Sequence, residues 1–547
     1  MFETCVIFSR RAFTHVPPSF SHYMNLLLPA CFAPQRRLLL GFSATILVFL
    51  LSVILPISSF AQVQTSSTAE RPLRDAANRA DYLVITPEQF LPDIDSYVRW
   101  RTSSTATHKG MRTFVATLGD INKEFLDRTK PQGQAEAIRS FISHTLQNWQ
   151  NPKPQYVLLI GSTTVLPAYR IKVTDFEFSQ PPYILNEDSI PMDNWYIVNK
   201  HIEEFNTRPQ AKIGRIPGRT GTEIRRVLQK IRTFEEYGNW MNYNRADRFT
   251  SIIDAQDAEM FDEWRSSIFD YLEATTKTTV TTATLSYRSI ANTLGAKQKT
   301  MQAINAGSPC LLYFGHGAPE KWSTFAIVTT DDVWNSFARD GRPFMFASLG
   351  CSQNYGIPSK LSIVESMMLL DNGGAVSSLA SSGYSNGSNG RYFLTVYFSE
   401  LFKNPGMDIG TAILRTSENV FGNLALIPQD DIYRRFSLLG DPAMVPFPRF
   451  LTSVKNETKQ AAEALQLSLS PNPSDGYTAL RYTLPAASRV RVEVLTMLGQ
   501  TILTQETTQA AGNHALELTT AAMPAGVYLC RLSAGSLAAT TMLRVVR

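Results

Sequence analysis

The stretches Cys310-Leu-Leu-Tyr-Phe-Gly-His316-Gly317 and Pro343-Phe-Met-Phe-Ala-Ser-Leu-Gly-Cys351 are each typical of an apolar strand that runs into one reactive side chain. Ligands of parallel sheets bind just beyond the carboxyl ends of the strands. His316 and Cys351 both fall at that place. The residues between them leave room for a crossover helix, predicted at 330–339, which neighbouring parallel strands require. The two strand ends are therefore expected to lie close together at one edge of a sheet.

A thiol beside an imidazole can be deprotonated as it attacks a carbonyl carbon, which makes Cys351 a candidate nucleophile and His316 its general acid and base. Gly317 lets a substrate approach closely, and the backbone N–H groups of Gly317 and Cys351 are candidates for holding an oxyanion. Taken singly, each side chain is more typical of a packed cysteine or a turn histidine, and it is the matching position of the two beside glycines that favours catalysis. Cys310 lies inside its strand and Cys530 inside a later one, so both are expected to be packing residues.

The flanking sequence alternates strands and helices. Apolar strands are predicted at 82–86, 112–117, 156–160, 211–213, 249–254, 310–314, 344–348 and 374–379, with helices at 93–100, 134–149 and 222–237. Such alternation indicates βαβ units and a mainly parallel sheet flanked by helices, an α/β fold. Residues 81–450 are too many for a single hydrophobic core. We therefore expect two subdomains, 81–250 and 251–450, with two sheets side by side.

The character of the chain changes near its end. Residues 451–466 are interpreted as a linker, and 467–547 carry seven short alternating strands separated by Pro and Gly turns. That pattern predicts a small all-β sandwich.

Residues 1–61 are predicted to be a signal peptide. Arg36 and Arg37 precede an apolar run from Leu38 to Ile57, and Ser59 and Ala61 are the small residues that a signal peptidase reads. The alternative is a retained membrane anchor, because about 20 apolar residues can span a bilayer. Residues 62–80 are expected to form a disordered leader. The true start can be Met24.

Charge and cysteine content narrow the function classes. The net charge is +5, and four arginines against Glu3 place +3 of it in the predicted signal peptide, leaving +2 for the rest. A nearly neutral body offers no footprint for nucleic acid. After signal removal three cysteines remain, Cys310, Cys351 and Cys530, an odd set that leaves at least one free thiol in an oxidising compartment.

Gly315-His316-Gly317 followed by Ala347-Ser-Leu-Gly-Cys351 resembles the gingipain-like cysteine peptidases of family C25, relatives of the caspases. Further matching motifs run through residues 81–450: Tyr156-Val-Leu-Leu-Ile-Gly161, Asp193-Asn-Trp-Tyr196, Ile213-Gly-Arg-Ile-Pro217 and Leu439-Gly-Asp-Pro442. The resemblance implies a caspase-like fold and a secreted or surface cysteine endopeptidase that acts through a Cys351–His316 dyad and a covalent acyl-enzyme on protein or peptide substrates.

Two departures from the family bear on specificity and domain content. Asn206 stands where arginine-specific gingipains look to carry an acid, and no immunoglobulin-like domain follows the catalytic part. Asp193 or Asp188 is expected either to assist the histidine, to bind substrate or calcium, or to serve as a turn or capping residue. The chemistry requires no cofactor and no metal ligand is assigned, while the resemblance allows a structural calcium ion.

The all-β segment 467–547 resembles a type IX secretion sorting domain, with Ser470-Pro-Asn-Pro473, Leu498-Gly-Gln500 and Pro524-Ala-Gly-Val-Tyr528 in the expected order. The resemblance implies the type IX machinery as a partner, passage through the outer membrane and a product that is released or attached to the outer-membrane surface. A carbohydrate-binding or adhesive sandwich is the alternative.

Other chemistries are less well supported. Gly383-Tyr-Ser385-Asn-Gly387 fits a serine-hydrolase elbow, but the only histidine after Ser385 is His514 in the sandwich, so the stretch is interpreted as a loop that forms a substrate wall. Zinc, nucleotide and dinucleotide motifs are missing from the sequence. Two functions remain open beside peptide hydrolysis: a caspase-like transpeptidase, and a catalytically inactive surface or adhesion protein.

Overall fold

The computed structural model describes most of the chain that follows the predicted signal peptide. It describes residues 64–65, 72–105, 107–172, 189–198, 209–236, 248–276, 281–287, 292–356, 360–383, 387–423, 435–447, 465–496, 501–535 and 537–546. The predicted signal peptide itself lies outside the described residues. None of the described helices combines the length and the apolar character that a membrane span needs.

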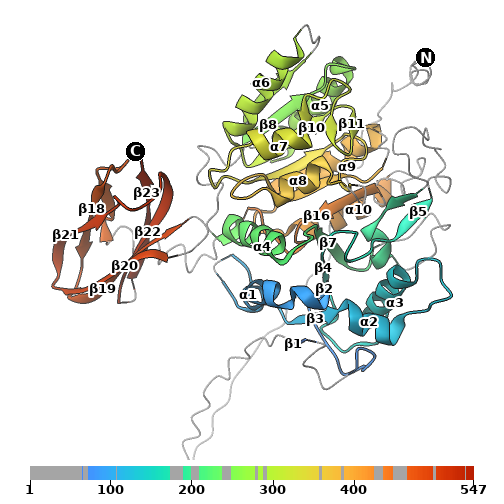
Figure 1. The fold of residues 1–547 in the computed structure, drawn as a ribbon, viewed down its shortest axis with the longest axis horizontal. Helices are drawn as coiled ribbons and strands as arrows, with labels where there is room; N and C mark the ends of the chain where they lie inside the picture. The colour runs from blue at the N-terminus through green and yellow to red at the C-terminus, as the bar shows by residue number, and fades with distance from the viewer. Residues whose placement is uncertain are drawn as a thin grey trace, which may run out of the picture. The chain divides into compact units, whose positions relative to one another are not determined.

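The body is built on one eleven-stranded sheet (Figure 1). Its strands are β1 (Gln64–Thr65), β2 (Tyr82–Thr86), β3 (Thr113–Thr117), β4 (Tyr156–Ile160), β7 (Lys212–Ile216), β8 (Arg248–Ile253), β9 (Thr281–Ser286), β10 (Cys310–Phe314), β14 (Phe344–Ser348), β15 (Ala375–Ser381) and β16 (Phe436–Leu439). Their order is β1-β3-β2-β4-β7-β16-β15-β14-β10-β8-β9. Every strand predicted for the body is present.

The expectation of two separate sheets side by side is corrected by the strand β16. It pairs in parallel with β7 through Leu439 and Arg215, and antiparallel with β15. The two expected sheets are therefore the two halves of one continuous sheet, and the halves run in opposite directions. Consequently the carboxyl ends of β10 and β14 lie at the same edge as the amino ends of β7 and β16.

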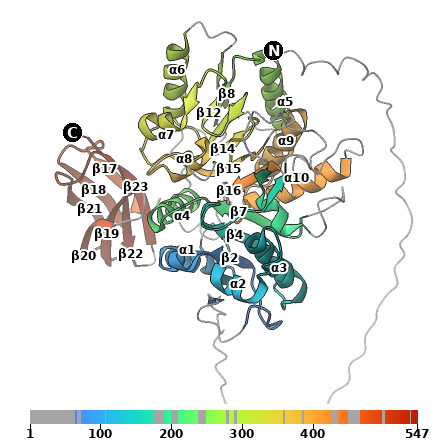
Figure 2. The ribbon, with the colours of Figure 1, turned by 45° about the vertical axis from the view of Figure 1, so that its right-hand side comes forward.

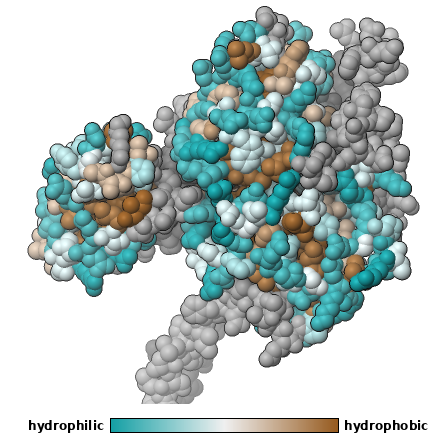
Figure 3. Space-filling view, in the orientation of Figure 1, coloured by the Kyte–Doolittle hydropathy of each residue, from teal (hydrophilic) through white to brown (hydrophobic). Residues whose placement is uncertain are grey.

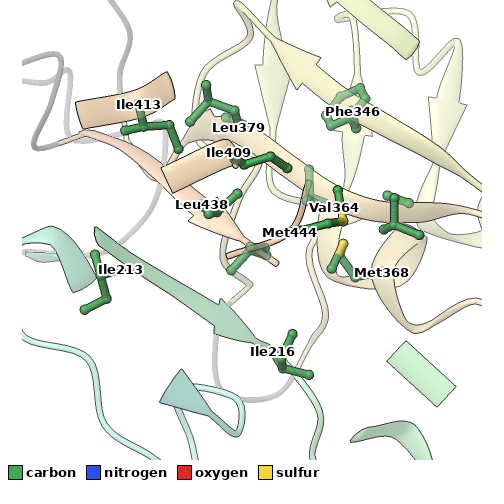
Figure 4. Packing of buried hydrophobic residues seen from close by; sticks show 14 of the residues in the cluster. Ile213, Ile216, Phe346, Val364, Met368, Leu379, Ile409, Ile413, Leu438 and Met444 are labelled. Carbon is green, nitrogen blue, oxygen red and sulfur yellow. The ribbon is translucent and has the colours of Figure 1, made fainter. Parts of the chain in front are cut away.

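One hydrophobic core runs across this junction. Figure 4 shows Ile213 and Ile216 of β7, Leu438 of β16, Leu379 of β15 and Phe346 of β14 among side chains from the covering helices. All five are less than a tenth exposed. Burial on both faces explains why β2, β4, β10 and β14 are nearly continuous apolar runs in the sequence.

Helices cover both faces of the sheet. They are α1 (Leu91–Thr102), α2 (Leu118–Phe125), α3 (Gly133–Asn148), α4 (Gly221–Glu236), α5 (Ala258–Thr276), α6 (Thr293–Asn305), α7 (Thr330–Ser336), α8 (Ile363–Leu369), α9 (Gly387–Lys403) and α10 (Ile409–Asn423), with the 3-10 turns η1 (Glu88–Phe90) and η3 (Asp193–Ile197). Figure 2 shows α1, α4, α8 and α7 on one side of the strands and α3, α10, α9 and α5 on the other.

Part of the expected leader is ordered. Gln64–Thr65 forms β1, which pairs in parallel with β3. Leu73 and Ala80 are buried, and the indole Nε1 of Trp149 donates to the carbonyl oxygen of Leu73 at 3.0 Å. The prediction of disorder is therefore wrong for 72–80, because apolar side chains in this short polar segment fill the core beside α3.

The C-terminal part is an all-β unit with a core of its own. One sheet holds β17 (Ser468–Ser470), β18 (Tyr477–Leu484) and β21 (Gly512–Thr519), and the other holds β20 (Thr501–Gln509), β19 (Ser488–Thr496), β22 (Gly526–Ala534) and β23 (Leu537–Val545). The seven predicted strands are thus all present. Buried and exposed residues alternate along β18, as expected for a strand with one face in the core.

Five short strands form two further small sheets. β5 (Arg170–Lys172) pairs with β6 (Ser189–Pro191), and a small antiparallel sheet of β11 (Gly317–Ala318), β12 (Lys321–Trp322) and β13 (Val328–Thr329) follows β10. In the view of Figure 3 the surface of the described body is mostly hydrophilic, with hydrophobic residues in small separate areas.

Candidate active site

His316 and Cys351 follow neighbouring parallel strands at equivalent positions. β10 pairs with β14 so that Tyr313 lies opposite Ser348. His316 comes three positions after Tyr313, and Cys351 three positions after Ser348. Neighbouring strands are about 4.8 Å apart. The two loops therefore leave the same edge of the sheet side by side, as the sequence predicts.

The two loops are in direct contact at Gly317. A Cβ atom built on Gly317 would lie 2.8 Å from the carbonyl oxygen of Cys351, and it would also collide with the side-chain amide of Gln353. A side chain at position 317 would thus push the histidine loop away from the cysteine loop. The expected role of Gly317 was access for substrate, and its contact with the Cys351 loop adds a second reason for glycine.

The imidazole of His316 is held from one side by a carboxylate. Its Nε2 lies 2.9 Å from Oδ2 of Asp257, and because a carboxylate only accepts, Nε2 donates. The ring also packs edge-on against Phe261, with centroids 5.6 Å apart. Nδ1 makes no hydrogen bond within the described part of the chain, so it is the ring nitrogen left for chemistry.

A second, buried carboxylate fixes the backbone of the histidine loop. Asp254, which follows β8 and is fully buried, accepts from the backbone N–H of His316 at 3.1 Å and from the hydroxyl of Ser323 at 2.6 Å. The hydroxyl of Tyr313 donates to the carbonyl oxygen of His316 at 2.6 Å. The loop therefore has little freedom, and the imidazole keeps its place at the sheet edge.

Asp254 and Asp257 are site residues that the sequence analysis missed. A signal for Asp254 existed, since it is an acid at the end of the predicted strand 249–254. Its use required the knowledge that β8 lies next to β10, with Ile253 opposite Phe314. Asp257 carries no such signal, because it stands in a polar loop and reaches His316 only through a backbone φ of 57°.

The cysteine loop is anchored on the end of β15. The N–H of Ser352 donates to the carbonyl oxygen of Gly383 at 2.7 Å, and that of Gln353 to Ser381 at 2.9 Å. Ser352 has a φ of 54°, in the left-handed region that favours glycine. Strained backbone of this kind concentrates at functional sites. The side chain of Cys351 is partly exposed.

Asp193 belongs to a buried ion pair. It is 2% exposed and forms a two-point ion pair with Arg215 of β7, at 2.6 and 2.7 Å. The hydroxyl of Tyr355 also donates to it at 2.7 Å. Burial alone would lower the pKa of Arg215, but the charge of Asp193 outweighs it and raises that pKa. The pair ties η3 to the sheet. Asp188, Ser385 and Asn206 lie outside the described residues.

The other two cysteines of the described chain are packing residues, as predicted. Cys310 and Cys530 are at most 1% exposed and form no disulfide. Burial raises the pKa of both thiols, that of Cys530 to about 12. A protonated, covered thiol is a poor nucleophile. Cys351 is therefore the cysteine of the described chain with access to solvent.

A cysteine and a histidine that follow neighbouring parallel strands at one edge of a helix-covered sheet are the arrangement expected of a cysteine peptidase with a caspase-like fold. The chain belongs to peptidase family C25, whose profile matches residues 75–447. Residues 468–546 match the secretion system C-terminal sorting domain. The prediction of a gingipain-like peptidase with a type IX sorting domain is thus confirmed.

Solved structures agree on the fold. The chain is similar to the Arg-specific cysteine proteinase gingipain R (RgpB), with 15% identity, a TM-score of 0.50 and coverage of 87% of this chain and 100% of that one. It is also similar to the complex of Porphyromonas gingivalis RgpB pro- and mature domains, with 15% identity, a TM-score of 0.50 and coverage of 85% and 100%. No curated protein sequence matches the chain.

These findings define a secreted cysteine-type peptidase, a hydrolase that acts on proteins. The sorting domain implies interaction with the type IX machinery and export to the extracellular or cell-surface compartment.

Proposed function

We propose that the protein is an endopeptidase in which Cys351 is the nucleophile and His316 the general acid and base. The observation that carries the proposal is the contact of Gly317 with the Cys351 carbonyl, together with the hydrogen bond that orients His316 toward Asp257. The parallel register of β10 and β14, which brings both loops out at one edge of the sheet, also supports the proposal.

The reaction proceeds in two halves. Nδ1 of His316 takes the thiol proton as Sγ of Cys351 attacks the carbonyl carbon of the scissile bond. The N–H groups of Gly317 and Cys351 hold the resulting oxyanion. The imidazolium then gives its proton to the leaving amine, and an acyl-enzyme remains. Water, deprotonated by His316, attacks the thioester, and the acid leaves as the thiol is restored. Asp257 stabilises the imidazolium in both halves.

No step of this reaction draws on a cofactor. Among the described residues, no group of three or more His, Cys, Asp or Glu side chains is placed to hold a metal ion. The structural calcium that the family resemblance allows therefore receives no site in the proposal. Activity after dialysis against EDTA, compared with activity after calcium is restored, tests whether such an ion stabilises the fold.

The sorting domain determines the destination of the enzyme. We propose that a signal peptide within residues 1–61 directs the first export step and that residues 467–547 direct passage through the outer membrane. The body is then released or attached to the outer-membrane surface after the domain is removed. Mass spectrometry of the cell-surface and secreted forms tests this route through their termini.

The experiment that tests the function is cleavage of a fluorogenic peptide library by the purified protein. We expect thiol-dependent cleavage that Cys351→Ala and His316→Ala each abolish. Cys310→Ala is the matched control, because it removes a buried thiol of the same sheet and should retain activity. Full activity of either site variant would contradict the mechanism. Preference for an added amine over water would indicate a transpeptidase, and inactivity of the wild type a scaffold or adhesion protein.

A further inference from the structure

Three buried polar atoms that have no hydrogen-bond partner in the described part of the chain directly follow Cys351. They are Oγ of Ser352 and both side-chain atoms, Nε2 and Oε1, of Gln353. The two residues are 1% and 0% exposed. Buried polar groups are almost always hydrogen-bonded, because an unpaired group loses its hydrogen bonds to water and gains none from the protein. A complete carboxamide without partners, two positions from a nucleophile, requires an explanation.

The surroundings of Gln353 are able to satisfy an amide. Its neighbour Asn354 is equally buried, yet its Nδ2 donates to the carbonyl oxygen of Ser437 at 2.7 Å and its Oδ1 accepts from Ser378 at 3.3 Å. Two adjacent carboxamides of the same loop thus differ completely in their hydrogen bonding. The unpaired state belongs to position 353 and not to the region as a whole.

The donor end of Gln353 lies between the two loops of the site. Cβ atoms built on Gly317 and on Gly350 would each approach Nε2 of Gln353 to less than 3.0 Å. Gly317 follows His316, and Gly350 precedes Cys351. The amide group therefore occupies the space that two glycine side chains would take, and its backbone is fixed to the end of β15 through Ser381.

We propose that Gln353 is a positioning residue of the active site. Its buried amide, unpaired within the described chain, sets the distance between the Gly317 and Cys351 backbones, and its dipole acts on the substrate oxygen that these backbones hold. The inference rests on the proposed function. Because Gln353 is fully buried, it acts through the two glycines and does not contact substrate. An N–H dipole without a partner keeps its field, which is strong in a dry site and favours negative charge on the substrate oxygen.

Loss of the Gln353 amide should affect the melting temperature and the rate of cleavage differently. Gln353→Met keeps the length of the side chain and removes both unpaired polar atoms. The melting temperature should stay the same or rise, because an unsatisfied amide no longer has to be buried. The kcat should fall by about 10- to 100-fold with KM within about twofold, because the lost interaction exists only in the transition state.

Two variants and one labelling measurement separate this role from a purely structural one. Asn354→Leu removes an amide whose nitrogen and oxygen are both hydrogen-bonded, so it should lower the melting temperature. Gln353→Glu should lose rate more strongly than Gln353→Met at neutral pH, and its rate relative to wild type should recover as the pH falls and the carboxylate is protonated. Alkylation of Cys351 by iodoacetamide forms no oxyanion and should proceed within about twofold of wild type in Gln353→Met.

Three results would contradict the proposed role of Gln353. A wild-type kcat in Gln353→Met, with Cys351→Ala inactive, overturns the inference and leaves the proposed function intact. A melting temperature and a kcat that fall together, with slower alkylation, also overturn it, because Gln353 would then only support the fold. Absence of any Cys351-dependent cleavage in the wild type overturns both proposals.

Discussion

The carboxylate of Asp257 lies 2.9 Å from Nε2 of His316, although the two residues belong to loops that follow different strands of the sheet. The side chains are 48% and 39% exposed, so solvent screens the pair. The carboxylate fixes which ring nitrogen carries the proton and leaves Nδ1 without a hydrogen bond to the described part of the chain. Both effects matter in a mechanism that moves a proton through this ring.

Asp257→Asn should lower kcat/KM by about 10-fold. This loss is much smaller than the loss caused by replacing a fully buried acid that orients a catalytic histidine, because the Asp257–His316 pair is half exposed. Asparagine keeps an oxygen that can accept from Nε2, so the variant tests the charge. Hydrolysis of the best library peptide provides the measurement. Asp262→Asn is the control, since that carboxylate stands on the nearby helix α5 but pairs with Arg265. Equal rates for the two variants would remove Asp257 from the mechanism.

Gly317→Ala should reduce kcat/KM by at least about 100-fold while the protein still folds, because misplacement of reacting groups by about 1 Å costs that much. The added methyl group would meet the Cys351 carbonyl at 2.8 Å. Gly295→Ala is the matched control: its Cβ would have an ordinary contact at 3.4 Å with Asn292, and it lies in the first turn of α6. Near-normal turnover in Gly317→Ala would show that the loops do not need to touch.

Most of the body could be predicted from the sequence because strands of a parallel sheet that are buried on both faces often consist of consecutive apolar residues. Cys310–Phe314 and Phe344–Ser348 show this directly, and their parallel register places His316 and Cys351 together. The reversal of direction at β16 could not be predicted. That strand is short, Phe436–Leu439, and its place between β7 and β15 depends on pairing with segments that are distant in the sequence.

The partner of Asp193 could not be predicted from the sequence for a related physical reason. The position of this acid outside a predicted strand fits an orienting residue, a substrate-binding residue and a turn residue alike. Its partner, Arg215, lies inside an apolar strand where a charge is costly unless it is paired. An arginine two positions beyond the predicted strand 211–213, in the run Ile213-Gly-Arg-Ile216, was the available sign that an acid had to be found for it. Neither residue points to the other by spacing.

The three described thiols should differ sharply in reactivity. Burial raises the pKa of Cys310 and brings that of Cys530 to about 12, so both remain protonated at pH 8. Iodoacetamide should therefore label Cys351 alone in the native protein at pH 8, and all three after unfolding. Peptide mapping by mass spectrometry measures this. Native labelling of Cys310 at a rate comparable with Cys351 would show that β10 opens readily.

The raised pKa values of the two buried thiols also determine how the free energy of unfolding changes with pH. A thiol whose pKa is raised in the folded state contributes fully below its unfolded value of about 8.5 and loses that contribution as the pH rises toward the folded value. The free energy of unfolding should therefore decrease above about pH 8.5. Cys530→Ala should make this decrease shallower in the sandwich, as measured by urea unfolding at pH 8 and pH 10. An unchanged slope would contradict the burial of that thiol.

The sandwich has a core that is independent of the body, since the buried cluster around Leu480, Val492 and Leu532 shares no residue with that of the main sheet. A chain that ends at residue 447 should therefore fold and cleave peptides when produced directly, with kcat/KM within about twofold of the full chain. The same truncation should abolish appearance of the enzyme at the cell surface or in the medium of a host with the type IX machinery. Leu480→Asp is the matched variant, because it disrupts only the sandwich core and should block export while leaving the body active. Loss of peptidase activity in both would mean that the sandwich is required for the fold of the enzyme and does more than direct its export.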